Sequence, residues 1–331
     1  MAGRRVLITG VSGQTGSELA SRLGSDPEFE YVAGLDTRPP PTELEGVDFI
    51  EADIRNPLIG KLLPQTEVDT VVHNQIVRRP TAGTSAQAAH DINVIGSLQL
   101  LAACEKTPTL RTIVVRGSAG IYGAEPNAPQ FFTEDMARLY PLRTRFQRDV
   151  AEIENYFETY SRRHTGVTTT MLRYQPAIGP SLDTQVTRYV SLPVVPTYLG
   201  FDPRIQWIHE RDAIDALVAA TRNPVRGPVN VAAEGTIGLT RMLRMAGKLT
   251  VPLLPPLFGA ASSAGKRAGV LRLSPDFERL LRYGRALDLT RLTDEIGFVP
   301  RFTTVAAVED FLKTQQGRRL APSVRQAVTR T

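Results

Sequence analysis

The chain has 331 residues, 42% of them hydrophobic and 22% charged, which excludes a mainly disordered protein because there is enough apolar material to form a core. The net charge is +5 and the single cysteine, Cys104, excludes a disulfide framework, while no apolar run is long enough for a transmembrane helix. The first residues lack the apolar segment of a secretory signal, and the four histidines show no metal-ligand spacing, so we expect a cytoplasmic enzyme or binding protein without a metal.

Short β-rich runs alternate with helical stretches along the first half of the chain. The expected strands are Arg4–Thr9, Phe29–Leu35, Asp48–Glu51, Val68–His73, Arg111–Arg116 and Val167–Leu172. The expected helices are Gln14–Leu23, Thr84–Cys104 and Arg143–Arg163. Such alternation is typical of βαβ units, and it predicts an α/β fold with a Rossmann-type, doubly wound parallel sheet.

After residue 174 the alternation ends, and proline and glycine become frequent. We therefore expect residues 1–174 to form the sheet domain, completed by later segments, and residues 175–315 to form a smaller C-terminal substrate lobe. Within this lobe Pro252–Ala268 is rich in apolar and small residues. It predicts a loop and a helix packed over a pocket, with a helix lying on a membrane surface as the alternative.

Residues 316–331 are expected to form a basic, flexible tail. No acidic residue follows Asp310, whereas Lys313 and several arginines do. Such a tail is either solvated and frayed or binds an anionic partner, and the sequence leaves both interpretations open. The basic balance of the whole chain does not by itself indicate nucleic acid, and no nucleic-acid partner is expected.

A glycine-rich turn follows the first strand and opens the first helix. Gly10, Gly13 and Gly16 stand in the pattern GxxGxxG: the first glycine permits a tight turn, the second lets the backbone approach a pyrophosphate, and the third allows close packing of helix on strand. The start of the helix, at Gln14 and Thr15, offers free N–H groups and the positive end of its dipole. The turn therefore predicts a dinucleotide-binding site.

The second strand is followed by Asp36, twenty residues after Gly16. A carboxylate at this place accepts hydrogen bonds from both ribose hydroxyls and repels a 2′-phosphate, which favours NAD over NADP. Arg38, two residues further on, leaves NADP as an alternative. A glycine turn with a capping aspartate and no nucleotide is the remaining interpretation.

Five further segments carry a resemblance to a known family. They are Glu51-Ala52-Asp53-Ile54-Arg55, Val71-Val72-His73-Asn74-Gln75, Asn93-Val94-Ile95-Gly96, Ser118-Ala119-Gly120-Ile121-Tyr122-Gly123 and Trp207-Ile208-His209 with Asp212. In these segments the chain resembles the extended short-chain dehydrogenases/reductases, the NAD-dependent epimerases and dehydratases of nucleotide sugars. The resemblance covers nearly the whole chain, and it is strongest to actinobacterial UDP-glucose 4-epimerase-like proteins.

The resemblance implies roles for individual residues. Asp53 and Ile54 would hold the adenine ring, and Asn93 would be the internal asparagine of the long helix. Asn74 would lie beside the cofactor, although Asn74 and Gln75 depart from the small residues usual there. Ser118 would be the active-site hydroxyl. The resemblance also implies NAD as the cofactor and a nucleotide sugar or related polyol as the substrate.

A homodimer is implied as well, through pairing of the helices Thr84–Cys104 and Arg143–Arg163 across a two-fold axis. The candidate contact residues are Leu98, Leu101, Ile153 and Phe157.

One departure from the family pattern concerns the chemistry. The family uses a tyrosine and a lysine four residues apart on the helix after the fifth strand, but none of the nine tyrosines is followed by lysine at that spacing. Alignment places Phe146 and Val150 at these positions, and a shift by one residue gives Arg145 and Asp149, which we expect to form a solvent-facing pair. Phenylalanine carries no exchangeable proton and valine carries no charge.

The candidates for the missing acid–base group are Ser118, Tyr122 and Tyr140. Three arginines, Arg173, Arg188 and Arg204, are expected to flank the substrate cleft, and Arg188 is the choice for a pyrophosphate clamp. His209 is expected to be structural or to bind substrate, and His73 and Cys104 are expected to be buried.

Two functions remain open at this stage. The first is an NAD-dependent enzyme of the epimerase/dehydratase type. The second is a non-catalytic NAD-binding regulatory or scaffold protein.

Overall fold

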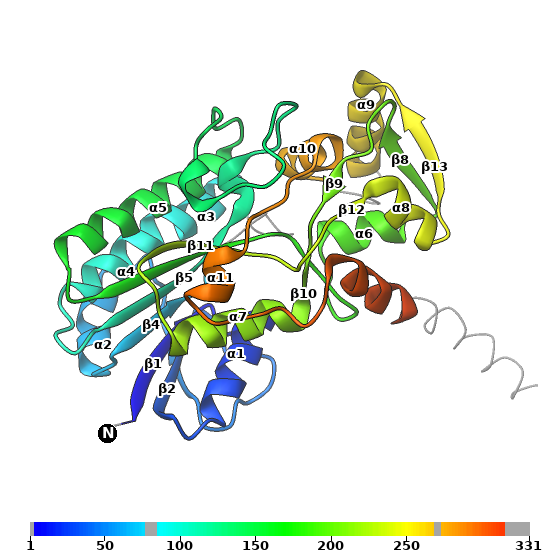
Figure 1. The fold of residues 1–331 in the computed structure, drawn as a ribbon. Helices are drawn as coiled ribbons and strands as arrows, with labels where there is room; N and C mark the ends of the chain where they lie inside the picture. The colour runs from blue at the N-terminus through cyan, green and yellow to red at the C-terminus, as the bar shows by residue number, and fades with distance from the viewer. Residues whose placement is uncertain (1–2, 77–84, 268–272, 315–331) are drawn as a thin grey trace, which may run out of the picture.

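The fold is known from a computed structural model, which describes residues 3–76, 85–267 and 273–314 (Figure 1). Seven parallel strands form the main sheet in the order β11-β6-β5-β4-β1-β2-β3. Their bounds are β1 (Arg4–Thr9), β2 (Phe29–Asp36), β3 (Asp48–Glu51), β4 (Thr70–His73), β5 (Thr112–Ser118), β6 (Thr168–Tyr174) and β11 (Gly227–Val231). This order confirms the predicted Rossmann-type, doubly wound sheet.

Helices cover both faces of the sheet (Figure 1). One face carries α1 (Gln14–Gly24), α7 (Glu210–Arg222) and the short α11 (Thr290–Asp294), and the other carries α2 (Ile59–Gln65), α4 (Gly96–Cys104) and α5 (Arg145–Arg163). Side chains of β1 alternate between the two layers, because successive residues of a strand point to opposite faces. Val6 and Ile8 pack in the core under α1 and α7, and Leu7 packs in the core under α4 and α5.

Two details differ from the elements expected from the sequence. No helix was expected at α2, where Gly60 and Pro64 are weak helix formers. The expected long helix Thr84–Cys104 is interrupted: α3 (Ala86–His90) and α4 are joined by a π-helical turn, η1 (Asp91–Ile95). Such turns often occur at functional sites, and this one contains Asn93; Thr84 itself lies outside the described residues.

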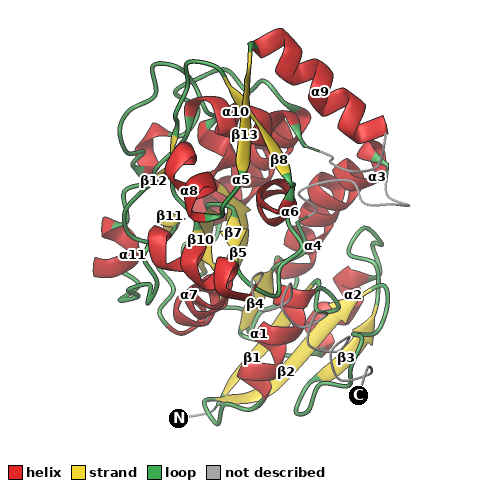
Figure 2. Ribbon diagram, turned by 90° about the vertical axis from the view of Figure 1, so that its right-hand side faces the viewer, coloured by secondary structure: helices red, strands yellow, loops and turns green. Residues whose placement is uncertain are grey.

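The C-terminal lobe has a core of its own. Its elements are α6 (Gln185–Ser191), β8 (Val194–Tyr198), α8 (Leu239–Met245), β13 (Leu249–Leu253), α9 (Pro255–Arg267), α10 (Pro275–Tyr283) and a helix over residues 304–314. The strands β8 and β13 pair, and α9 lies along them (Figure 2). Phe258 of α9 stacks on Tyr198 at 3.9 Å between ring centres, so the apolar segment Pro252–Ala268 is in part a packed helix, as expected; residues 268–272 lie outside the described residues.

Short elements connect the two parts. They are the two-residue strands β7 (Ala177–Ile178), β9 (Arg204–Ile205), β10 (Ile208–His209) and β12 (Ile237–Gly238), and the 3₁₀ turns η2 (Ala119–Tyr122) and η3 (Glu134–Met136). No helix within the described ranges is long and apolar enough to cross a membrane. The basic tail 316–331 lies outside those ranges.

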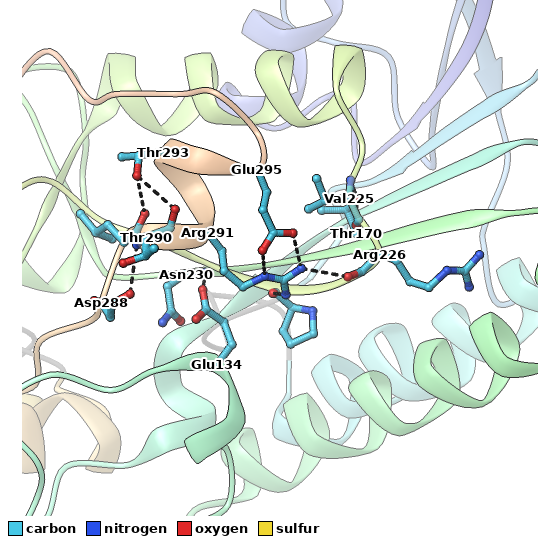
Figure 3. A network of polar contacts seen from close by, with 12 residues as sticks. Glu134, Thr170, Val225, Arg226, Asn230, Asp288, Thr290, Arg291, Thr293 and Glu295 are labelled. Carbon is cyan, nitrogen blue, oxygen red and sulfur yellow. Dashed lines mark hydrogen bonds and ion pairs between the residues drawn. The ribbon is translucent and has the colours of Figure 1, made fainter.

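Strand β11 returns from the lobe to the edge of the main sheet, and polar contacts hold it there (Figure 3). Arg291 of α11 donates to the Arg226 carbonyl at 3.1 Å and forms an ion pair with Glu295 at 2.6 Å. On the other side, the Glu134 carboxylate accepts the Asn230 N–H at 2.8 Å. The sheet is therefore completed by chain that follows residue 174.

Candidate functional site

The turn between β1 and α1 has the geometry that a dinucleotide phosphate requires. Gly10 has a φ of +73°, and a Cβ there would lie 3.0 Å from the main chain just after β4. A Cβ at Gly16 would lie 2.1 Å from the Gly10 carbonyl oxygen, so only glycine lets α1 pack this closely on β1. Gly13 is the N-cap of α1, no side chain caps this helix, and its first turn contains no acidic residue. The N–H groups of Gln14 and Thr15 therefore remain available to an anion.

Asp36 lies beside this turn, at the end of β2. Its Oδ2 accepts the Ser12 N–H at 3.1 Å, and its Oδ1 accepts the Thr37 N–H at 2.8 Å. Because β2 pairs with β1, these bonds hold the carboxylate next to the glycine turn. The contact of Asp36 with ribose hydroxyls remains a prediction, and the position suits it.

Polar side chains also follow β4 at the same edge of the sheet. Asn74 Nδ2 donates to the Gly10 carbonyl at 3.3 Å. The Gln75 Oε1 is buried and has no hydrogen-bond partner among the described residues. Buried polar atoms are normally paired, so this amide oxygen, the uncapped start of α1 and the glycine turn together fit a dinucleotide running along the carboxyl edge.

The residues expected at the adenine end lie further along the same edge. Arg55 Nε lies 3.0 Å from both carboxylate oxygens of Asp53, and these hydrogen bonds lower the pKa of Asp53. Ile54 is fully buried against Gly96, where a Cβ would lie 2.5 Å from Ile54 Cδ1. Asn93 is buried within the π-helical turn. Their contacts with a cofactor remain predictions.

A cavity of about 210 Å³ opens beside the end of β5, between the sheet and the C-terminal lobe. Ser118 lines it and accepts the Gly120 N–H at 3.1 Å. A Cβ at Gly120 would lie 3.2 Å from Ser118 Oγ and 3.3 Å from the ring of Phe146. The hydroxyl and the ring thus both lie beside Gly120 in the cavity wall, where a phenol would be needed for a proton relay.

Among the residues that the structure describes, three charged side chains line this cavity: Asp183, Asp276 and Arg285. Asp276, in the first turn of α10, accepts a hydrogen bond from the Thr144 hydroxyl at 3.0 Å, and burial raises the pKa of its carboxyl. Arg285 donates from Nη2 to Gln175 Oε1 at 3.1 Å, and burial lowers its pKa to about 10. The cavity is therefore lined by a half-buried carboxyl group, Asp276, and a buried guanidinium, Arg285.

The two tyrosines considered as substitutes for the missing phenol do not line the cavity. The Tyr122 hydroxyl accepts from Arg173 Nη1 at 2.8 Å and donates to Asn230 Oδ1 at 2.6 Å. Its side chain is buried, and burial raises its pKa to about 12. The Tyr140 hydroxyl donates to the Asn127 carbonyl at 2.6 Å. Both hydroxyls are used within the fold, which disfavours either of them as the acid–base group.

The start of α5 corrects an expectation. Arg145 and Asp149 do not form a solvent-facing pair: Arg145 donates to Gln87 Oε1 at 2.8 Å, and the buried Asp149 contacts His90 Nδ1 at 2.7 Å. Both partners belong to α3, which covers this side of α5. Val150 is 2% exposed, so the position of the family's lysine is filled by a packed aliphatic side chain.

The two residues expected to bind substrate are not among the residues that line the cavity. Arg188, on α6, forms an exposed ion pair with Asp183 and is not among the lining residues. His209 is fully buried, accepts the Arg211 N–H at 3.2 Å and stacks on Phe302 at 3.7 Å between ring centres. These contacts favour the structural one of the two roles expected for His209.

The other arginines expected beside the cleft also have other surroundings. Arg173 forms a buried, bidentate ion pair with Glu154, with N–O distances of 3.0 and 2.8 Å. Arg204 lines a separate cavity of about 380 Å³. Cys104 is buried in the core, as expected. His73 is buried too, between Thr9 and Ser97 hydroxyls at 2.8 and 2.9 Å.

Sequence reasoning missed Asp276 and Arg285 in the cavity beside Ser118, and Arg116, which lines another cavity together with Gln14 and Thr15. The first two lie in the irregular C-terminal region, where no motif marks them. Arg116 did carry a signal: it is the one charged residue of β5, a strand that is otherwise apolar or small.

The chain is similar in sequence to one protein family and to individual proteins. Residues 6–232 match the model of the NAD dependent epimerase/dehydratase family. An uncharacterised protein of Mycobacterium tuberculosis is 37% identical over 326 residues, which cover 96% of this chain and 85% of that protein. A second uncharacterised protein of the same organism is 27% identical over 317 residues, which cover 95% of this chain and 30% of that protein.

Solved structures share the fold. The UDP-glucose 4-epimerase of Thermotoga maritima with UDP-glucose superposes with a TM-score of 0.70 at 16% identity, covering 95% of this chain and 99% of that one. MoeE5 in complex with UDP-glucose and NAD superposes with a TM-score of 0.71 at 19% identity, covering 96% and 99%. At these identities the likeness shows the fold.

Proposed function

Since this chain belongs to the NAD dependent epimerase/dehydratase family, we propose that it binds NAD along the carboxyl edge of the sheet and a nucleotide sugar or related polyol in the cavity beside Ser118. The observation that carries the proposal is the uncapped start of α1 behind a glycine turn, with Asp36 on the neighbouring strand. Two structures of the same fold contain UDP-glucose, one of them with NAD. We also propose that the protein is cytoplasmic.

The chain's own residues limit the chemistry of this site. Bound NAD supplies a hydride acceptor at its nicotinamide, and the substrate hydroxyl must then lose a proton. Phe146 cannot accept it. Among the described lining residues, the carboxylates of Asp183 and Asp276 are the anionic groups that can accept a proton. Asp183 is exposed and paired with Arg188, so the proton passes to Asp276, and we expect turnover well below that of an enzyme with a tyrosine–lysine pair.

Asp36→Ala tests the cofactor site. Loss of the carboxylate leaves the ribose hydroxyls unpaired, so NAD binding is expected to weaken by about 1–3 kcal/mol, measured by calorimetry. Asp294→Ala is a matched control, because Asp294 is an exposed carboxylate on α11. Equal NAD affinity in Asp36→Ala and wild type would remove the assignment.

A non-catalytic NAD-binding regulatory or scaffold protein is the second candidate function. The observation that favours it is the apolar pair Phe146 and Val150 at the positions of the relay. Tight NAD binding without turnover across a panel of nucleotide sugars supports this function. Interconversion of UDP-glucose and UDP-galactose that Ser118→Ala abolishes supports the enzyme.

A further inference from the structure

Arg116 of β5 has no carboxylate partner in the part of the chain that the structure describes. Its Nη1 donates to Asn74 Oδ1 over a long 3.4 Å, and its guanidinium carbon lies 5.5 Å from the centre of the Tyr174 ring. Its Nε is buried and has no hydrogen-bond partner among the described residues. Burial also lowers the pKa of this arginine. A cation held in such surroundings costs free energy unless an anion joins it.

The guanidinium lies at the edge of the sheet where the cofactor is proposed to bind. Arg116 lines a cavity of about 200 Å³ together with Gln14 and Thr15, the first two residues of α1. The loop after β7 closes one side of this cavity, because Gln14 Nε2 donates to Ser181 Oγ at 3.0 Å. The free N–H groups of an 11-residue helix and an unpaired arginine thus share one small space.

The two acids among the described residues lining this cavity, Glu18 and Glu210, contact other groups. Glu18 contacts Arg22 at 2.9 Å. Glu210 accepts the Ser181 N–H at 3.1 Å. Neither carboxylate contacts Arg116 within hydrogen-bond distance, so the charge of the guanidinium stays available to a ligand.

We propose that Arg116 binds a phosphate oxygen of the dinucleotide's diphosphate. The N–H groups of Gln14 and Thr15 hold the diphosphate from the helix, and Arg116 holds it from the sheet. The planar fork of a guanidinium matches two oxygens of a phosphate, and such charge-assisted bonds are among the strongest in proteins. This inference rests on the proposed NAD binding. Arg116 is a positioning residue, and it takes no part in proton transfer.

A purely structural role of Arg116 and a role in diphosphate binding lead to opposite expectations for the stability of a variant that lacks this arginine. If the contacts with Asn74 and Tyr174 are its role, its removal lowers the melting temperature and leaves NAD affinity unchanged. If the diphosphate is its partner, replacing Arg116 removes an unpaired buried cation from the ligand-free protein, which becomes equally or more stable. The affinity for NAD falls at the same time. Melting temperature and affinity therefore separate the two roles.

The experiment compares wild type with Arg116→Gln and Arg116→Lys by calorimetry and by thermal unfolding of the ligand-free protein. NAD and ADP-ribose are expected to bind Arg116→Gln about 10- to 100-fold more weakly, the loss of one charge-assisted hydrogen bond. The factor is the same for both because both carry the diphosphate. Arg116→Lys recovers part of the affinity. Arg111→Gln is the matched control: Arg111 is an exposed arginine just before β5, and NAD affinity stays as in wild type.

Several outcomes overturn the proposal. Unchanged NAD affinity with a lower melting temperature assigns Arg116 to the fold, and the proposed function stands. Weaker binding of NAD but not of ADP-ribose places the contact at the nicotinamide half. A wild-type protein that binds neither NAD nor inorganic pyrophosphate overturns both the inference and the proposed function. Binding of pyrophosphate alone, weakened in Arg116→Gln, supports the anion site and overturns NAD as its ligand.

Discussion

Asp276 is the residue that we propose as the proton acceptor in the Ser118 cavity. It must be ionised to accept the substrate proton, and burial raises the pKa of its carboxyl. The rate is therefore expected to fall as the pH drops through this raised pKa and to stay level above it. Asp276→Asn is expected to lower kcat by about 10²-fold or more, measured as interconversion of UDP-glucose and UDP-galactose, while NAD affinity stays unchanged.

Glu278→Gln is the control for this variant. Glu278 lies on the same helix, α10, and accepts a hydrogen bond from the Ser262 hydroxyl of α9 rather than facing the cavity. Its replacement is expected to leave the pH profile as in wild type. An Asp276→Asn protein with the wild-type rate and pH profile would show that the proton leaves by another route.

Residues that lie close together in the sequence were the ones that could be predicted. The turn from Gly10 to Gly16 is a contiguous signal with a known physical reason at each glycine, and Asp36 follows at a fixed distance. The cavity is different, since it joins Ser118 to Asp276 and Arg285, more than 150 positions away. No local pattern reports such a contact, because it arises only when the lobe folds back on the sheet.

At the scale of one helix, the first turn of α5 presents Phe146 to Ser118. A capping box fixes this turn: Thr144 Oγ1 accepts the Gln147 N–H at 3.1 Å, and Gln147 Oε1 accepts the Thr144 N–H at 3.1 Å. Phe146→Tyr leaves the cap intact and adds a hydroxyl beside Ser118. We expect it to raise kcat by about 10-fold or more at unchanged stability, measured by turnover and thermal unfolding.

Val150→Lys, at the position of the family's lysine, is a less informative variant than Phe146→Tyr. Val150 packs with Ala119 and Ile121 in a buried cluster, so a lysine there must bury its charge and lowers the free energy of unfolding. Phe146→Tyr without any gain in turnover, at normal NAD affinity, would favour the regulatory function.

Helices and strands could be predicted from the sequence where their hydrophobic patterns were long or continuous. All six expected strands are present. The central strands β1 and β4 are buried on both faces and form continuous apolar runs, which the sequence shows directly. The π-helical turn Asp91–Ile95 could not be predicted, since the residues on either side continue a helical pattern. The strands β9 and β12 have two residues each, too few to show any periodicity.

On the scale of the whole molecule, the expected dimer depends on the outer faces of α4 and α5. Leu101, Ile153 and Phe157 are buried in the core of their own chain, which corrects their choice as contact residues. Leu98 is 46% exposed and Ile95 is 43% exposed. This small apolar surface predicts a weak homodimer, and Leu98→Glu is expected to shift it to monomer at micromolar concentration in light scattering. A wild-type monomer under these conditions would contradict the pairing.

Strand β11 reaches the main sheet only after the chain has passed through the lobe, and Arg291 and Glu134 secure it there from two sides. A cut at residue 174 would therefore leave β6 as an open edge, ready to pair with other chains. The lobe cannot be replaced as an independent domain, because removing it also removes β11 and α7 from the sheet. We therefore expect substitutions in the cavity wall to change substrate specificity without loss of the fold, and exchange of the whole lobe to disrupt the sheet.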